Sequence, residues 1–214
     1  MASRLPKSVR ITATDLNPPM IDYAQSVGTA RPVAWQAADV MSLPFEDASF
    51  DAVVCQFGAM FFPDRRAAFA EVARVLRPGG VFVFNVWNRL DQNEFAALIS
   101  AEVAAQFPDI AADFLARTPY GYYDEPTIQA DVAGGGVESP AKFELVEARS
   151  RAESAEMPAI GFCQGTPLRN EITASDPERL ADVTAAAARA IERSFGASNV
   201  DGKISAFVLT AIKA

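Results

Sequence analysis

The fold is decided by residues 65–87, RRAAFAEVARVLRPGGVFVFNVW, where a helical pattern runs into an apolar strand pattern. Apolar side chains recur at helical spacing in Arg65–Leu76, at Ala68, Phe69, Val72, Val75 and Leu76. Pro78-Gly79-Gly80 then stops the helix. The run Val81–Trp87 is apolar almost throughout, which is typical of a strand covered on both faces. The stretch therefore predicts one helix–strand unit of an α/β sheet.

Three more apolar runs precede this unit and predict further strands, at Val9–Thr14, Val33–Ala37 and Asp51–Phe57. Asn17-Pro18 predicts the start of a helix that runs to about Gln25, with proline at its first position. Strands that alternate with helices through short links predict right-handed crossovers. We expect a Rossmann-like, doubly wound α/β fold with a mostly parallel sheet.

The pattern changes beyond Asn88, and we interpret residues 91–142 as a helical insertion that could cover a site as a lid. One helix is predicted there from its buried stripe, which consists of Phe95, Leu98, Ile99, Val103 and Phe107. The remainder is poorly patterned and holds a tyrosine cluster at Tyr120, Tyr122 and Tyr123. That cluster lines an aromatic pocket or belongs to a packed loop.

Residues 143–214 are predicted to add a C-terminal helix and strands to the same domain. Phe143–Val146 is predicted as a strand, and Ser175 with Glu178 as a capping box that starts a helix. Ile204–Ile212 is predicted as a last strand that follows a turn at Asp201-Gly202. No internal repeat is visible, so we expect one domain over residues 1–214 with residues 9–87 as its core.

Composition excludes several classes of function. The chain has 214 residues, 50% of them hydrophobic, and 19 Lys and Arg against 27 Asp and Glu, so a nucleic-acid partner is not expected. It has no histidine, which removes a histidine base and any histidine-ligated metal, and we expect no metal site. No run approaches the ~20 apolar residues of a membrane span, so a cytoplasmic protein is expected. Cys55 and Cys163 are interpreted as reduced core thiols, and a disulfide between them is the alternative.

Four short segments carry a family resemblance. They read ITATDLNPPM at residues 11–20, ADV at 38–40 with LPF at 43–45, SFDAVV at 49–54, and RVLRPGG at 74–80. In this order and spacing, the chain resembles class I S-adenosylmethionine-dependent methyltransferases. The resemblance is strongest to the branch of ubiquinone and menaquinone biosynthesis enzymes.

The resemblance implies that Asp15, at the end of the first strand, accepts hydrogen bonds from both ribose hydroxyls of S-adenosylmethionine. The alternative is that Asp15 only caps a turn, but Asn17 already offers a cap and leaves Asp15 freer to face a ligand. Leu16 and Met20 line the adenine in this resemblance, or else belong to the plain core.

The other implied contacts follow the second and third strands. Asp39 hydrogen-bonds the exocyclic amine of adenine with Val40 beside the ring, unless Asp39 is an ordinary surface residue. Gln56 borders the methyl donor, and Phe61 and Phe62 contact substrate or simply pack. Because methyl transfer to a reactive nucleophile depends mainly on alignment, the sequence names no catalytic residue.

The family's glycine-rich loop has no counterpart ahead of the first predicted strand, because the first glycine of the chain is Gly28. Backbone N–H groups of such a loop meet the amino-acid end of the cofactor. We therefore expect that the first strand and glycine loop of the family are missing and that S-adenosylmethionine binds weakly or not at all. The exposed sheet edge then needs direct pairing of its neighbours, a rearranged sheet, or a second chain, whether a homo-oligomer or a different partner.

These observations favour methyl transfer from S-adenosylmethionine to a small, largely apolar or aromatic molecule. The aromatic residues near the strand ends motivate that acceptor class, since apolar pockets with few polar groups bind such ligands. Two alternatives stay open. One is a catalytically inactive interaction module that retains the fold, and the other is an NAD-dependent oxidoreductase, in which an acidic residue after a strand binds the ribose.

Overall fold

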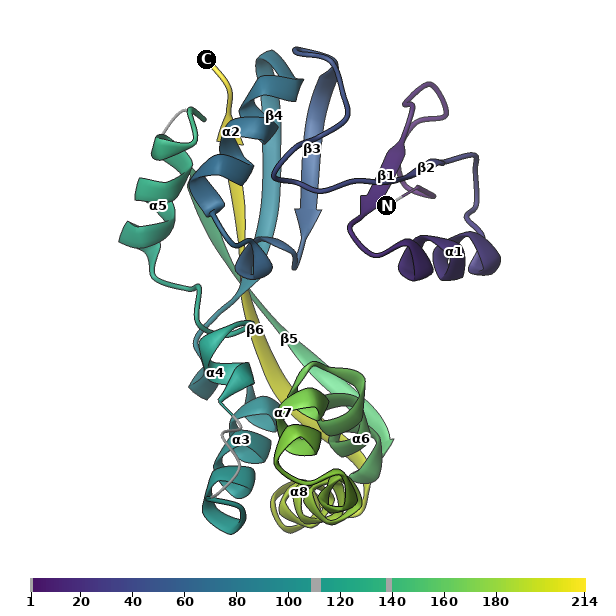
Figure 1. The fold of residues 1–214 in the computed structure, drawn as a ribbon, viewed down its shortest axis with the longest axis vertical. Helices are drawn as coiled ribbons and strands as arrows, with labels where there is room; N and C mark the ends of the chain where they lie inside the picture. Colours follow the sequence, from purple (N-terminus) through teal and green to yellow (C-terminus); the bar gives the residue numbers. More distant parts are fainter. Residues whose placement is uncertain (1, 109–112, 138–139) are drawn as a thin grey trace.

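The computed structural model describes residues 2–108, 113–137 and 140–214, and it shows an α/β chain with two lobes. A sheet lobe carries most strands, and a helical lobe gathers α3, α4, α6, α7 and α8 (Figure 1). The strands are β1 (Thr12–Asp15), β2 (Ala34–Ala37), β3 (Phe50–Gln56), β4 (Leu76–Trp87), β5 (Lys142–Ser154) and β6 (Ser198–Ile212).

Helices follow in the same order. They are α1 (Pro18–Val27), α2 (Arg65–Val75), α3 (Glu94–Gln106), α4 (Phe114–Arg117), α5 (Glu125–Gly134), α6 (Glu156–Gly165), α7 (Leu168–Ser175) and α8 (Leu180–Phe195). Short 3₁₀ helices occupy Ala59–Phe61, Leu90–Gln92 and Pro177–Arg179. No helix in these described ranges is both long and apolar enough to cross a bilayer.

The α/β class and the four predicted strands of the first half are confirmed, but the strands do not share one sheet. β1 and β2 form a parallel pair of their own, whereas the second sheet has the order β3-β4-β6-β5. In that sheet β3 and β4 are parallel, and β6 is antiparallel to both β4 and β5. The second sheet is therefore mixed rather than mostly parallel, because β5 and β6 are long antiparallel strands that extend into the helical lobe.

Two local predictions in the C-terminal part are wrong. Ser175 ends α7 and starts no capping box; instead the Asp176 side chain accepts a hydrogen bond from Glu178 N, 3.0 Å away. Asp201-Gly202 is no turn, since both residues lie inside β6 opposite Arg151 and Ser150. Cross-strand pairing with β5 keeps this glycine extended, and the sequence gives no sign of that pairing.

Each lobe has its own buried core. In the sheet lobe, Phe69 of α2 packs on Phe82 and Phe84 of β4, with ring centroids 5.4 and 5.3 Å apart. In the helical lobe the stripe predicted for residues 95–107 is confirmed, since Phe95, Ile99 and Val103 are buried against the other helices there. The predicted insertion is thus divided: α3 and α4 join the helical lobe, whereas α5 lies beside α2 on the sheet lobe (Figure 1).

One side chain ties the loop between β2 and β3 to helix α2. Arg74 donates to the carbonyl oxygens of Leu43 and Phe45 at 2.9 and 2.7 Å, and to the carboxylates of Asp47 and Glu71, both at 2.8 Å. Glu71 accepts from Leu43 N at 2.7 Å. The hydrogen bond from Arg74 holds the pKa of Glu71 below its usual value. The loop is therefore fixed by backbone and carboxylate contacts to a single guanidinium.

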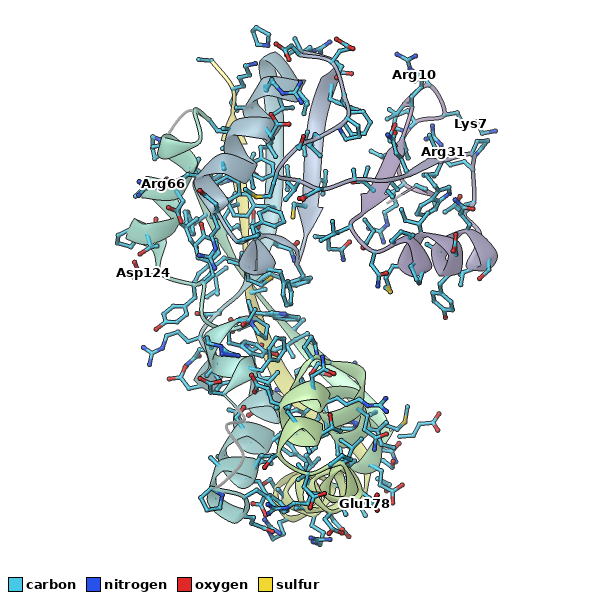
Figure 2. All side chains as sticks on the ribbon, viewed as in Figure 1. Lys7, Arg10, Arg31, Arg66, Asp124 and Glu178 are labelled. Carbon is cyan, nitrogen blue, oxygen red and sulfur yellow. The ribbon has the colours of Figure 1, made fainter. Side chains whose placement is uncertain are left out.

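Arg31 fixes the segment that leads into β1 by hydrogen bonds to its backbone. Its guanidinium donates to the carbonyl oxygens of Leu5, Pro6 and Lys7, at 3.2, 2.6 and 3.0 Å, and also to that of Val9. Figure 2 places Lys7, Arg10 and Arg31 together beside the start of β1. This end of the small sheet is consequently basic.

Replacing Gly202 with alanine should destabilise the protein, whereas the same change at Gly161 should stabilise it. A Cβ on Gly202 would lie 2.9 Å from the ring of the buried Phe95, and overpacking of this kind costs about 1–3 kcal/mol. A Cβ on Gly161, in the exposed middle of α6, meets nothing within 4 Å, and alanine there gains roughly 0.5–1 kcal/mol. Urea unfolding of both variants measures the two signs, and an unchanged Gly202→Ala protein would contradict the packing described.

The Glu71–Arg74 contact should make stability depend on acid pH. Because the pKa of folded Glu71 lies below its ordinary value of 4.5, its contribution is complete above about that pH and is lost as pH falls through the lower, folded value. Glu71→Gln should therefore flatten the fall in unfolding free energy below pH 4.5, measured by urea titrations at several pH values. An exposed Glu46→Gln variant in the same loop controls for loss of a carboxylate alone, and equal slopes in all three proteins would refute the coupling.

Candidate functional site

The carboxyl ends of β1 and β2 bring two predicted acidic residues to one edge. Asp15 pairs in register with Ala37, and Ala38 N donates to the Asp15 carbonyl oxygen at 3.0 Å. Asp39 follows one residue later. The parallel pairing thus places Asp15 and Asp39 on neighbouring strand ends, which is where open α/β sheets bind ligands.

Asp15 shapes the turn on which it lies. One carboxylate oxygen accepts a hydrogen bond from Asn17 N at 2.8 Å, while Asn17, the N-cap of α1, makes no side-chain cap bond. The expectation that Asn17 would relieve Asp15 of a local role is therefore wrong. The Asp15 side chain is nevertheless exposed, and a carboxylate has acceptor capacity beyond one hydrogen bond.

Leu16 and Met20 do not belong to the core. Both residues are apolar, yet they are 70% and 53% exposed. Leu16 lies between β1 and α1 next to Asp15, and Met20 lies in the first turn of α1. Ile21, by contrast, is the buried residue of α1. Two exposed apolar side chains next to a carboxylate are a suitable surface for the flat face of a ligand.

Asp39 is held in a tight turn. Its Oδ1 accepts from Met41 N at 2.9 Å, and its backbone oxygen accepts from Ser42 N at 3.0 Å. Val40 is half-buried and packs against the core of the sheet lobe. The turn presents Asp39 at the surface, and Arg74 fixes the loop that continues from it.

Gln56 lies at the end of β3 and so in the other sheet from Asp15 and Asp39. A cavity of about 1660 Å³ separates the two sheets and is lined by parts of β1, β2 and β3 with the segment ahead of β1. The parallel pairing of β1 and β2 thus brings Asp15 and Asp39 to one edge, with Leu16 next to Asp15 and Met20 in the first turn of α1. Val40 follows Asp39 but packs against the core of the sheet lobe, and Gln56 lies on the second sheet.

Aromatic rings gather near the carboxyl ends of β3 and β4. The Phe57 ring stacks on Trp87 with centroids 4.1 Å apart and planes 19° apart, and Trp87 lies 5.8 Å from Tyr120. Phe61 is 50% exposed, and its ring centroid lies 6.4 Å from that of Phe114 of the helical lobe. Together, Phe57, Phe61, Trp87, Phe114 and Tyr120 form an aromatic cluster between the two lobes.

Other residues near this cluster are structural. Phe62 packs edge-on against Phe69, as the packing alternative predicted. Tyr122 is buried, with its hydroxyl 3.2 Å from Asp131 and the Arg65 guanidinium 4.1 Å from its ring centroid. Burial, and then the charge of Asp131, raise the pKa of Tyr122. Both tyrosines of the cluster region are therefore neutral at physiological pH, since burial also raises the pKa of Tyr120.

Sequence reasoning missed Asn85, which accepts a hydrogen bond from Phe57 N at 3.2 Å. A signal was present, since Asn85 is the single polar side chain in Val81–Trp87.

Cys55 and Cys163 are both free thiols, so the disulfide that the sequence left possible is not formed. Burial raises the pKa of each, so neither is an activated nucleophile.

Comparison with known proteins gives one family match in the first half of the chain and similarity to several methyltransferases. Residues 1–84 match the family described as "Methyltransferase domain". A demethylmenaquinone methyltransferase of Deinococcus radiodurans is 42% identical over 77 residues, which are 35% of this chain and 32% of that protein. A malonyl-[acyl-carrier protein] O-methyltransferase of Hahella chejuensis is 45% identical over 71 residues, 33% of this chain and 25% of the relative. The chain thus spans about a third or less of these relatives.

Solved structures share the fold along most of the chain. The YcgJ protein of Bacillus subtilis superposes with a TM-score of 0.52 at 17% identity, over 95% of this chain and 82% of that one. A SAM-dependent methyltransferase of Methanosarcina mazei gives a TM-score of 0.50 at 16% identity, with 95% and 82% coverage. Residues 1–84 therefore match the methyltransferase-domain family, and the fold of the chain is similar to that of solved methyltransferases.

Proposed function

We propose that the edge formed by Asp15, Leu16, Met20 and Asp39 binds the adenosine half of S-adenosylmethionine, and that the domain transfers its methyl group to a small apolar or aromatic molecule. The observation that supports this most is the pair of carboxylates on adjacent strand ends with two exposed apolar residues beside them. That edge lies within the segment matched to the methyltransferase family.

Each residue has a chemical role in this proposal. Asp15 uses its free acceptor capacity for the two ribose hydroxyls, since charge-assisted bonds to a carboxylate are strong and directional. Asp39 accepts from the exocyclic amine of adenine, and Leu16 and Met20 cover the ring with Val40 behind it. Gln56, at the carboxyl end of β3, borders the methyl-donor region in this proposal.

The aromatic cluster is the proposed acceptor surface. It lies at the carboxyl ends of β3 and β4, and it joins the sheet lobe to the helical lobe through Trp87 and Tyr120. When bound, S-adenosylmethionine supplies a sulfonium methyl group that a nucleophile attacks in line. The chain's part is to align and desolvate the acceptor, which needs no catalytic base when the nucleophile is already reactive.

The amino-acid half of the cofactor has no comparable binding surface among the described residues. Ile11 and Asp15 turn their carbonyl oxygens to β2, so the backbone groups of Thr12 and Thr14 lie on the other edge of β1, where Thr12 lines the cavity. Ala52 and Val54 of β3 line the opposite wall. Two strand edges that point broadly the same way thus flank the cavity (Figure 1), and a buried edge needs hydrogen-bond partners.

One face of the larger sheet is also open. Val53 and Cys55 share a face with Phe82 and Phe84, which α2 covers, whereas Val54 lies on the other face. On that other face Val54, Val146 and Ile212 are 44%, 40% and 52% exposed. Strands of a parallel α/β sheet are ordinarily buried on both faces, so this face is suited to a covering helix.

Connection handedness links the cavity to the open face. From the cavity, the strand order runs to β1 and β2 in one direction and to β3 and β4 in the opposite direction. Right-handed connections between parallel strands place their helices on opposite faces when the strand order runs in opposite directions. Since α2 joins β3 to β4 and covers one face, a helix leading into β1 belongs on the other. We propose that a strand–helix unit encoded directly ahead of residue 1 fills the cavity and covers the open face, and completes the cofactor site.

A catalytically inactive interaction module is the second candidate. The observation that favours it is the cavity, because an unfilled cavity leaves the sulfonium end of the cofactor without a wall. We place the protein in the cytoplasm in either case, since both cysteines are free thiols.

Residues 1–214 alone should bind S-adenosylmethionine at least about a thousandfold more weakly than a form extended upstream. Loss of two or more charge-assisted hydrogen bonds, each worth roughly 1.5–3 kcal/mol, accounts for that difference. Isothermal titration of both forms measures it. Tight binding by residues 1–214 would show that a second copy or a rearranged sheet replaces the unit, and light scattering then distinguishes a dimer from a monomer. If neither form binds S-adenosylmethionine or NAD, the inactive module is favoured.

In the extended form, Asp15→Asn should weaken binding of S-adenosylmethionine by roughly 10–100-fold. The amide retains an oxygen for Asn17 N but loses the charge that two ribose hydroxyls need. Asp22→Asn, on the exposed side of α1, is the matched control for the same charge change. Equal affinities for the two variants would reject the ribose assignment, and methylation of nucleic acid alone would reject the acceptor class.

A further inference from the structure

Phe57 has an unusual backbone conformation at the end of β3. Its φ is +51°, in the left-handed region that residues other than glycine rarely adopt. The residue after it is Gly58, where an added Cβ would lie 2.8 Å from Cys55 Sγ. The backbone therefore turns sharply here, and something must hold Phe57 in a conformation that costs free energy.

Asn85 is the side chain that holds it. Its Oδ1 accepts from Phe57 N at 3.2 Å, and Asn85 pairs in register with Gln56, the residue just before the turn. On the other side of the turn, the side chain of Cys55 lies so close to Gly58 that it leaves no room for a Cβ there. The turn is thus bonded to β4 through Asn85 and packs on Cys55 of β3.

The conformation decides where the Phe57 ring goes. With Phe57 turned, the ring stacks on Trp87, two residues beyond Asn85 on the same strand, and Trp87 lies against Tyr120. We propose that Asn85 is a positioning residue, which holds Phe57 in the left-handed conformation and thereby sets the aromatic wall of the acceptor site. The acceptor role of this wall rests on the function proposed above, whereas the positioning itself does not.

The test uses Trp87 as its reporter, because Trp35 and Trp87 are the two tryptophans of the chain. In a Trp35→Phe background, Asn85→Leu removes the acceptor at similar size, and Asn85→Asp retains an oxygen. We expect Asn85→Leu to roughly double acrylamide quenching of Trp87 and to abolish the near-ultraviolet circular dichroism of the stacked rings. Asn85→Asp should resemble the parent. The proposal is overturned if Asn85→Leu leaves both signals unchanged, or if Asn85→Asp loses them equally.

A thermal cycle covers the case in which Asn85→Leu unfolds easily. Glycine adopts positive φ without strain, so Phe57→Gly removes the need for a holding contact. Asn85→Leu should lower the melting temperature by roughly 3–6 °C in the parent and by less than half of that in Phe57→Gly. An equal loss in both backgrounds would show that Asn85 only packs in β4. Neither measurement requires methyl transfer, so this inference can fail while the proposed function stands, and the reverse.

Discussion

The guanidinium of Arg74 makes the contact on which the arrangement of the proposed cofactor edge depends. It bonds the carbonyl oxygens of Leu43 and Phe45 and the carboxylate of Glu71, and so fastens the loop after β2 to helix α2. β1 and β2 share no hydrogen bonds with β3. The position of Asp39 relative to the larger sheet therefore depends on the loop between β2 and β3. Fixed backbone acceptors around one planar donor set the loop more firmly than an exposed ion pair would.

The cavity beside that loop and the open sheet face have one physical cause. Parallel strands need neighbours on both edges and cover on both faces, and here one edge of β1, one edge of β3 and one face of the larger sheet lack them within the described residues. A single strand–helix unit meets all three needs, because handedness directs its helix to the uncovered face. The same unit would provide the missing half of a cofactor site.

The two lobes meet at the aromatic cluster, which gives the proposed acceptor site its chemistry. Trp87 contacts both buried cores, and its partners Phe57 and Tyr120 come from the two sides. An acceptor bound there would be enclosed by residues from segments far apart in the sequence. Burial raises the pKa of Tyr120, the titratable member of this cluster, so the cluster favours apolar contact over acid–base chemistry.

The sequence by itself determined the α/β class, the strands and helices of residues 9–107 and the carboxylates at the first two strand ends. These depend on local periodicity, capping and strand-end position, which a single chain displays directly. Only the tertiary structure decided that β1 and β2 stand apart, that Asp201-Gly202 lies within a strand, and that Leu16 and Met20 are exposed. It alone showed that Asn85 accepts a hydrogen bond from Phe57 N. Each of these depends on contacts between distant segments, whose register no local pattern records.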